Sequence, residues 1–212
     1  GVDLVVSSLT KGIGGFGTDL GGIVVGGNDF HGPLLSFRKD FGGVLSPKSA
    51  WPILVYGLPT LSVRLRQQQQ TALRISTFLE ADPRVERVSY PGLDSFPQKE
   101  LAQRQMRDYE GQFSPGTLIY FELREDPEFP GRNGQRFIDH IGENAYSVTM
   151  AVSLGQVKTL IEHPYSMTHS SMTGGSVPSD LIHSAGIRMS VGLEKGEDLI
   201  LDLRQALEAV FT

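Results

Sequence analysis

The sequence predicts a chain in two parts, the larger of which is a mixed α/β or α+β domain. Thirteen of the 25 glycines lie in residues 1–60, whereas most of the charged residues lie beyond residue 60. In that later part, short β-branched segments alternate with amphipathic segments on a rhythm of ~30 residues, which is typical of mixed folds. We therefore expect the 212 residues to form two domains, residues 1–60 and residues 61–212.

The first predicted element is a short buried strand containing Leu4, Val5 and Val6. Hydroxyl residues and Lys11 follow, and then four glycines within residues 12–17. Glycine at this density allows close approach of the backbone to another group, or a positive φ. A lysine at the end of a buried strand, between hydroxyls and glycines, indicates a side chain that faces a ligand.

The remaining elements follow from periodicity and capping signals. Ser46 and Pro47 are typical of a helix start, and Asp82 and Pro83 of a helix end. The expected strands are 22–26, 85–90, 117–123, 145–152 and 187–191, and the expected helices are 34–41, 48–56, 61–80, 97–109, 134–141, 155–162 and 196–211.

Composition argues against several classes of protein. No apolar run approaches the ~18 residues of a membrane span, and the net charge of −5 gives no support for binding nucleic acid or anionic membranes. The absence of cysteine excludes disulfides and thiolate metal sites. No signal peptide precedes the first strand, so we expect a cytoplasmic protein with no membrane or nucleic-acid partner.

Two motifs at the front of the chain suggest other functions. Residues 12–17 match G-x-G-x-x-G, but a dinucleotide site needs a helix there and an apolar strand follows instead. Ser8 and Lys11 match S-x-x-K, in which a lysine activates a serine for acyl transfer. The S-D-N and K-T-G elements of that chemistry are missing, the nearest strings being residues 179–181 and 158–160. A serine acyltransferase remains an alternative.

The three histidines His163, His169 and His183 do not have the spacing of a metal site. Their spacing places no pair on one helical face, and no H-E-x-x-H pattern occurs. We expect histidines held by hydrogen bonds, and no metal.

Ser153 and Arg188 each have a structural and a ligand-binding interpretation. Ser153 and Gln156 form a capping-box pattern at the start of the expected helix 155–162, so in the structural interpretation the hydroxyl serves that helix alone. Arg188 lies within an apolar strand, where its charge must be paired or must face a ligand. A planar guanidinium is suited to binding a carboxylate through two hydrogen bonds. An arginine on an edge strand that reaches solvent is the alternative.

Several segments resemble those of a known family, in the same order along nearly the whole chain. They include Ser8-Leu-Thr-Lys11-Gly-Ile-Gly-Gly, Leu160-Ile-Glu-His-Pro-Tyr-Ser-Met-Thr-His169 and Arg188-Met-Ser-Val-Gly-Leu-Glu194. These segments resemble the Cys/Met-metabolism pyridoxal-phosphate enzymes, which include cystathionine γ-synthase, cystathionine γ-lyase, methionine γ-lyase and O-acetylhomoserine sulfhydrylase. The resemblance covers only the carboxyl-terminal half of such an enzyme.

The resemblance implies an α/β fold of the aspartate-aminotransferase-like type (fold type I). Residues 1–60 would be the carboxyl-terminal part of the large cofactor-binding domain. Residues 61–212 would be the small domain, with a mainly antiparallel sheet and the helix 196–211 packed on it.

The resemblance also implies the roles of five residues. Lys11 would form the Schiff base with pyridoxal 5'-phosphate, and Ser8 and Thr10 would donate hydrogen bonds to its phosphate. Ser153 and Arg188 would hold the α-carboxylate of an amino-acid substrate. Lys11, once released, would be the general base.

The implied activity is γ-elimination or γ-replacement on sulfur-containing or O-acylated homoserine-type amino acids, as a lyase or transferase of methionine and cysteine metabolism and transsulfuration. The family's self-association implies a homo-oligomer such as a homotetramer. The amino-terminal half of these enzymes supplies further contacts to the cofactor. The alternative is therefore an incomplete half-enzyme that depends on a separate amino-terminal chain.

Overall fold

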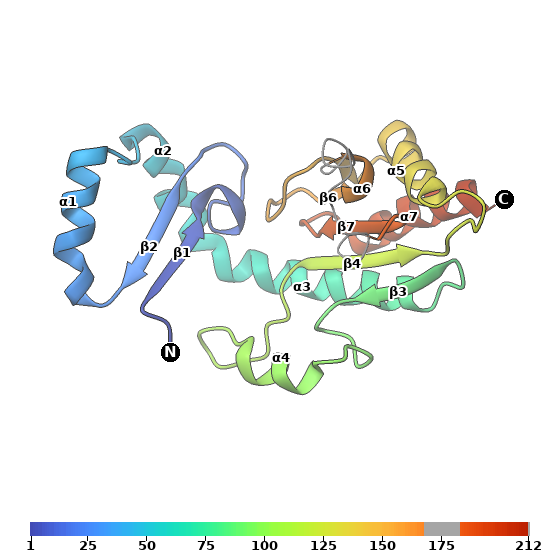
Figure 1. Cartoon of the computed structure of the whole chain (residues 1–212), viewed down its shortest axis with the longest axis horizontal. Coiled ribbons are helices and arrows are strands. Elements are labelled where there is room, and N and C mark those ends of the chain that lie inside the picture. Colours follow the sequence, from blue (N-terminus) through green and yellow to red (C-terminus); the bar gives the residue numbers. More distant parts are fainter. Residues whose placement is uncertain (168–182, 212) are drawn as a thin grey trace. The chain divides into compact units, whose positions relative to one another are not determined.

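The computed structural model describes residues 1–167 and 183–211 and divides the chain into two compact units, Gly1–Ser62 and Val63–Thr212 (Figure 1). This division lies two residues beyond the expected boundary. That the units are parts of a large and a small domain stays a prediction. None of the helices in the described ranges is both long enough and apolar enough to cross a lipid bilayer.

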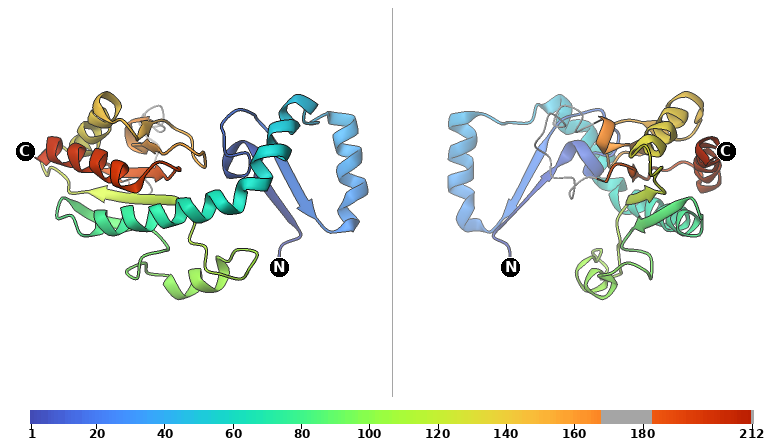
Figure 2. Two further views of the ribbon diagram at one scale, coloured as in Figure 1. Left: turned by 180° about the vertical axis from the view of Figure 1, so that it is seen from behind. Right: turned by 45° about the vertical axis from the view of Figure 1, so that its right-hand side comes forward.

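The first unit begins with an antiparallel hairpin, shown from two sides in Figure 2. Strands β1 (Leu4–Ser8) and β2 (Gly22–Gly26) pair along their full length. Both strands were predicted, but the predicted burial of β1 is wrong. Val5 is 50% and Val6 73% exposed. Neighbouring residues of a strand point to opposite faces. Both faces of β1 are therefore accessible within the described chain.

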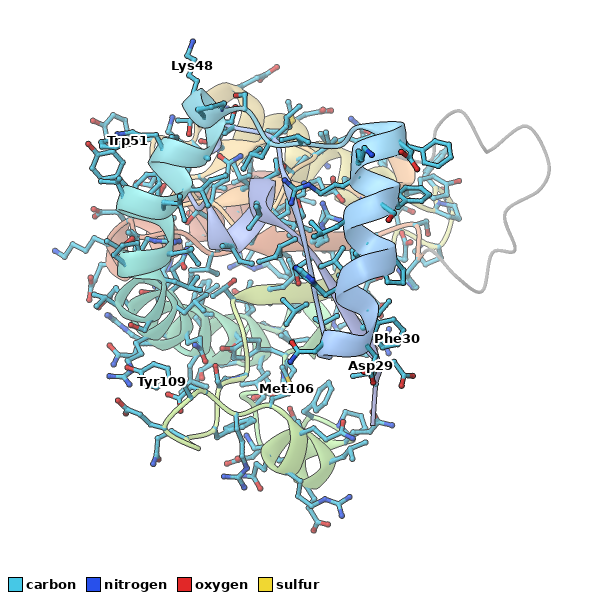
Figure 3. The ribbon with its side chains drawn as sticks, turned by 90° about the vertical axis from the view of Figure 1, so that its left-hand side faces the viewer. Asp29, Phe30, Lys48, Trp51, Met106 and Tyr109 are labelled. Atoms are coloured by element: carbon cyan, nitrogen blue, oxygen red, sulfur yellow. The ribbon has the colours of Figure 1, made fainter. Side chains whose placement is uncertain are left out.

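The helices of the first unit follow the hairpin: η2 (Asn28–Phe30), α1 (His31–Phe41), α2 (Pro47–Pro52), η3 (Ile53–Gly57) and the start of α3 (Leu58–Glu80). The Ser46 side chain accepts a hydrogen bond from the Ser49 amide at 3.1 Å, which confirms the predicted cap. Figure 3 shows Lys48 and Trp51 projecting outward from α2. Trp51 is exposed, so this helix also leaves apolar surface uncovered.

The second unit is built on a five-stranded sheet with the order β3-β4-β7-β6-β5. Its strands are β3 (Val85–Ser89), β4 (Leu118–Leu123), β5 (Thr149–Met150), β6 (Leu160–Glu162) and β7 (Gly186–Ser190). Only the β5–β6 pair is parallel, so the predicted mainly antiparallel sheet is confirmed. Its helices besides α3 are α4 (Lys99–Gln105), α5 (Arg132–Asn144), α6 (Pro164–Met167) and α7 (Gly196–Phe211).

The core of the second unit lies between one face of this sheet and three helices. Strand residues that point to this face are buried against apolar residues of α3, α5 and α7. The rings of Phe121 on β4 and Phe137 on α5 meet edge to face, with centroids 5.9 Å apart. Because strand residues alternate between faces, the residues next to these core positions lie on the opposite face, called the polar face below because it carries Glu122, Glu162 and Arg188.

The predicted helix 155–162 is wrong, and with it the capping-box interpretation of Ser153. Residues 160–162 are strand β6, and Gly155 has a φ of +76°. Bonds to distant residues hold this segment extended. The Glu194 carboxylate accepts the Thr159 amide at 3.0 Å and the Thr159 hydroxyl at 2.7 Å, and Gln68 donates to the Gln156 carbonyl at 2.8 Å. The predicted strand 145–152 is likewise reduced to β5.

Candidate active site

Lys11 lies in a tight turn that directly follows strand β1. The turn, η1 (Leu9–Ile13), is closed by the Leu9 carbonyl, which accepts the Gly14 amide at 2.9 Å. Lys11 itself has non-helical φ and ψ values of −89° and −137°, so the backbone kinks at the lysine. The Lys11 carbonyl accepts the Gly15 amide at 2.8 Å, and the residue is half-buried. These bonds hold the backbone on both sides of the lysine.

The glycines beside Lys11 have the two uses predicted from their density. Gly15 and Gly17 have φ values of +77° and +68°, which other residues rarely adopt. Gly57 permits a close backbone approach: a Cβ there would lie 2.8 Å from the Ile13 carbonyl oxygen and 3.0 Å from that of Gly14. Sequence reasoning assigned no role to Gly57. Its only signal was its place in the segment Gly57-Leu-Pro-Thr-Leu-Ser-Val-Arg64, which also resembles the Cys/Met-metabolism enzymes.

The two hydroxyls near Lys11 are in different situations. Thr10 Oγ accepts the Gly21 amide at 3.0 Å and donates to the Gly21 carbonyl at 3.4 Å, so it closes the glycine loop. Ser8 is exposed at the end of β1, and its hydroxyl caps no amide of the following turn. An amine, an available hydroxyl and a glycine-rich backbone are donors suited to an aldehyde that carries a phosphate. The predicted bond from Thr10 to the phosphate stays a prediction.

The structure rejects a Rossmann site at residues 12–17. The loop leads into β2, which pairs antiparallel with β1, so no helix begins there to receive a pyrophosphate. The position of Ser8 does not decide the S-x-x-K alternative, because Ser8 is both the last residue of β1 and the residue that directly precedes the turn η1.

Arg188 lies in β7, between β4 and β6, at the centre of the sheet of the second unit. The alternative of an edge-strand arginine is therefore wrong. Its Nη2 lies 2.8 Å from Oε1 of Glu162, which is 2% exposed, and 3.5 Å from the Val152 carbonyl oxygen. The Arg188 side chain is 29% exposed. Its charge is paired from one side and still accessible to a ligand.

Ser153 lies in a loop that is held to the second unit at both ends. Before it, the buried carboxylate of Asp202 on α7 accepts the amides of Ser147 at 2.7 Å and Val148 at 3.0 Å. After it, the Gly155 amide donates to Ser190 Oγ on β7 at 2.7 Å. Sequence reasoning missed Asp202 and Ser190. Asp202 did carry a signal, because it lies on the apolar face of the predicted helix 196–211.

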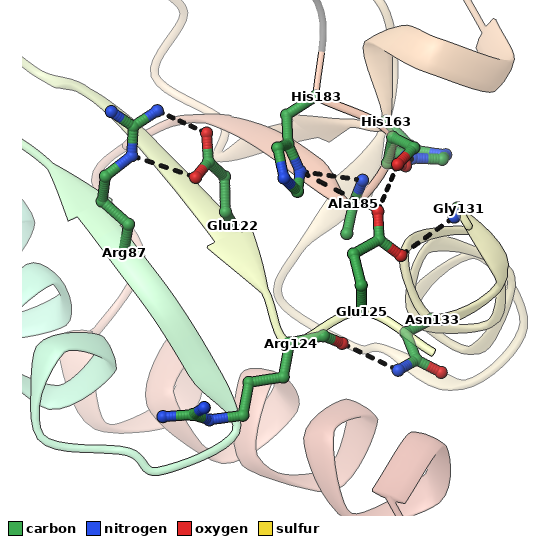
Figure 4. A network of polar contacts seen from close by, with 10 residues as sticks. Arg87, Glu122, Arg124, Glu125, Gly131, Asn133, His163, His183 and Ala185 are labelled. Atoms are coloured by element: carbon green, nitrogen blue, oxygen red, sulfur yellow. Dashed lines mark hydrogen bonds and ion pairs between the residues drawn. The ribbon is translucent and has the colours of Figure 1, made fainter. Parts of the chain in front are cut away.

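A histidine cluster lies at another part of this unit (Figure 4). His163 is buried, with Nε2 2.6 Å from the Ser184 carbonyl oxygen and Nδ1 2.9 Å from Ser166 Oγ. Burial lowers the pKa of His163, so the neutral ring is favoured. The predicted hydrogen-bonded histidine is confirmed at His163, and His169 lies outside the described residues. Among the described residues, no three side chains are grouped as metal ligands.

The comparisons with known proteins bear on the chain as a whole. The sequence profile of the family described as "Cys/Met metabolism PLP-dependent enzyme" matches residues 1–208. The chain belongs to this family. An L-methionine gamma-lyase from Porphyromonas gingivalis is 38% identical over 99% of the chain, and one from Pseudomonas putida is 41% identical over the same share. In each case the match covers 49% of the relative.

Solved structures of family members agree with the fold. A cystathionine gamma synthase from Xanthomonas oryzae pv. oryzae, in complex with aminoacrylate and cysteine, is 36% identical and matches 99% of the chain with a TM-score of 0.85. The match covers 51% of that chain. The fold is therefore that of the fold type I enzymes of this family, and the chain spans about half the length of the curated relatives it matches.

Proposed function

We propose that the chain supplies the catalytic lysine and the substrate-binding arginine of a pyridoxal-phosphate-dependent enzyme acting on sulfur-containing or O-acylated homoserine-type amino acids. The reaction is γ-elimination or, with a thiol in place of water, γ-replacement, and we place it in the cytoplasm. The observation that carries the proposal is Lys11 at a backbone kink in a hydrogen-bonded turn, in a family match that runs over residues 1–208.

Each unit contributes its own residues to this chemistry. Lys11 is the amine that would bind the cofactor, with Ser8 and Thr10 as candidate phosphate donors. When bound, pyridoxal phosphate supplies an electron sink that stabilises negative charge next to the amino group. Lys11 would take the proton from the substrate Cα and, once it had released that proton, would take a second one from Cβ as the group at Cγ leaves with its electron pair. Arg188 and Ser153 bind and orient the α-carboxylate.

The uncovered surface of the first unit supports the partner-dependent form of this proposal. Valines of β1 and β2 are exposed, and Val5 and Val6 show that both faces of β1 are uncovered. Large apolar patches on a soluble protein commonly mark interaction sites. Because the chain spans half the length of its relatives, we propose that a polypeptide corresponding to their amino-terminal half covers this hairpin, within a homo-oligomer.

The test is covalent labelling of Lys11. The chain is incubated with pyridoxal phosphate, alone and with an amino-terminal half of a family enzyme, then reduced with borohydride and mapped by mass spectrometry. We expect the adduct on Lys11. Lys11→Ala should abolish it, and Lys48→Ala, which removes another lysine of the same unit, should not. An adduct that persists in Lys11→Ala under both conditions contradicts the proposal.

The partner is tested in the same assay. Val6→Asp places a charge on the exposed hairpin, whereas Val2→Asp alters an exposed valine just outside it. If the amino-terminal half covers the hairpin, it should increase the labelling of the parent chain and of Val2→Asp, and much less that of Val6→Asp. Equal labelling of all three chains with and without the added half contradicts partner dependence.

A further inference from the structure

The polar face of the sheet carries two buried carboxylates, each paired with an arginine. Glu162 on β6 lies opposite Arg188 in the strand register, and it is 2% exposed. Glu122 on β4 lies opposite Arg87 on β3, and it is 6% exposed. The two carboxylates are similar in chemistry and burial, but the geometry of the arginine differs between the two pairs.

Arg87 binds the carboxylate of Glu122 through two nitrogens. Its Nε lies 3.0 Å from Glu122 Oε2, and its Nη2 bonds the other oxygen (Figure 4). Burial alone would raise the pKa of Glu122, but the hydrogen bonds of Arg87, the charges of His183 and Arg87 and the hydrogen bond of Tyr120 together outweigh it, and the pKa is lowered. The two donor nitrogens of Arg87, Nε and Nη2, are therefore both bound by the protein itself.

Arg188 is held through one nitrogen. Nη2 makes both contacts of this side chain, to Glu162 Oε1 and to the Val152 carbonyl. Within the described part of the chain, its Nε and Nη1 have no hydrogen-bond acceptor. Each of these nitrogens shares one edge of the planar guanidinium with Nη2, so each offers a second carboxylate an N–H beside the nitrogen that is already held. Glu162 thus holds Arg188 and leaves Nε and Nη1 as donors.

The charge of Glu162 and the position in which it holds Arg188 have opposite effects on the binding of an anionic ligand. A carboxylate beside Arg188 reduces the positive potential that an anionic ligand meets, so the charge of Glu162 opposes binding. A buried acceptor that fixes the guanidinium favours binding, because a preorganised side chain loses less conformational freedom when the ligand arrives. Whether removing Glu162 strengthens or weakens ligand binding therefore distinguishes the effect of its charge from the effect of its position.

We propose that Glu162 is a positioning residue for carboxylate binding, holding Nη2 of Arg188 so that the donors which this ion pair leaves open face the α-carboxylate of the substrate. This inference rests on the role given to Arg188 in the proposed function, but it needs neither the cofactor nor a second polypeptide for its test.

The test measures binding of propionate to the full chain by NMR. The Nε–Hε signal of Arg188 is assigned by its loss in Arg188→Lys and followed as propionate is added. Glu162→Met keeps the length of the side chain but removes the acceptor, and Glu162→Gln restores an acceptor without charge. Glu122→Met is the matched control, because it removes the other buried carboxylate of this face. Unfolding of each variant is recorded in parallel.

We expect a saturable shift in the parent chain and at least fivefold weaker binding in Glu162→Met, which is about 1 kcal/mol and within the coupling found for contacting residues. Glu162→Gln and Glu122→Met should bind within about twofold of the parent chain. Unchanged or tighter binding in Glu162→Met overturns the proposal. So does equal weakening in Glu122→Met, or the absence of saturable binding in the parent chain.

If Glu162→Met fails to fold, a second variant still tests the proposal. Glu162→Asp keeps the charge and retracts the acceptor, so weaker binding supports the proposal and unchanged binding overturns it. A normal propionate result with no adduct on Lys11 would remove the proposed function alone. In an active enzyme, loss of positioning should raise KM for the amino acid more than it lowers kcat.

Discussion

Replacing Gly57 by alanine should disturb the turn that carries Lys11. The added Cβ would stand 2.8 Å from the Ile13 carbonyl oxygen, so the two backbones must separate by about 0.6 Å to reach the 3.4 Å of an ordinary contact. Both neighbours are backbone atoms, which cannot rotate away. Overpacking of this kind destabilises by ~1–3 kcal/mol.

The assay combines urea unfolding with the yield of borohydride-reduced cofactor on Lys11. Gly32→Ala is the matched control, since a Cβ at Gly32 meets nothing within 4 Å and an alanine in helix α1 is favoured by up to ~1 kcal/mol. We expect Gly57→Ala to lose both stability and adduct, and Gly32→Ala to lose neither. If Gly57→Ala unfolds at the parent's urea concentration and labels equally well, the close approach does not shape the lysine turn.

Three further predictions concern the second unit. Asp202→Asn should destabilise by ~1–3 kcal/mol in urea unfolding, because a carboxylate that accepts the Ser147 and Val148 amides is replaced by a weaker acceptor; an unchanged midpoint would show that the loop needs no such anchor. The pKa of His163 is lowered by burial, so the parent chain should lose stability as the pH falls below about 6.5, and His163→Gln should flatten that slope in urea titrations between pH 7.5 and 5. The pKa of Glu122 is lowered, so the stability that this carboxylate contributes is fully present above the ordinary glutamate pKa near 4.5 and is lost as the pH falls through the pKa of the folded state. The difference in stability between the parent chain and Glu122→Gln should therefore shrink on acidification. A difference that stays constant would contradict the pairing of Glu122 with Arg87.

Local sequence signals predicted an element correctly where its conformation depends on its own residues. Helix α7 begins and ends at the predicted residues, because its apolar positions recur with a helical period over Gly196–Phe211. The strands β1, β2, β3, β4 and β7 were likewise predicted to within a residue or two from β-branched and apolar runs. The segment 155–162 failed because its conformation is decided by Glu194 and Gln68, which are distant in the sequence.

The sequence identified residues of the candidate site by their type but did not identify the residues with which they pair. Arg188 was found because a charge in an apolar strand needs a partner, yet nothing local identifies Glu162 as that partner. The pairing depends on the register of β6 with β7, which brings residues 26 positions apart side by side. Glu162 was placed in a helix that does not form, so its orientation could not be anticipated. The burial expected for β1 failed because the hairpin has no covering layer in the described chain.

The ion pair between β6 and β7 has a consequence for biogenesis. A lone cation within a newly collapsed sheet would oppose folding until some anion reached it. Arg188 instead meets its counter-ion, the carboxylate of Glu162, on the neighbouring strand of the same polypeptide. The second unit therefore needs no bound anion to neutralise this charge while its sheet forms.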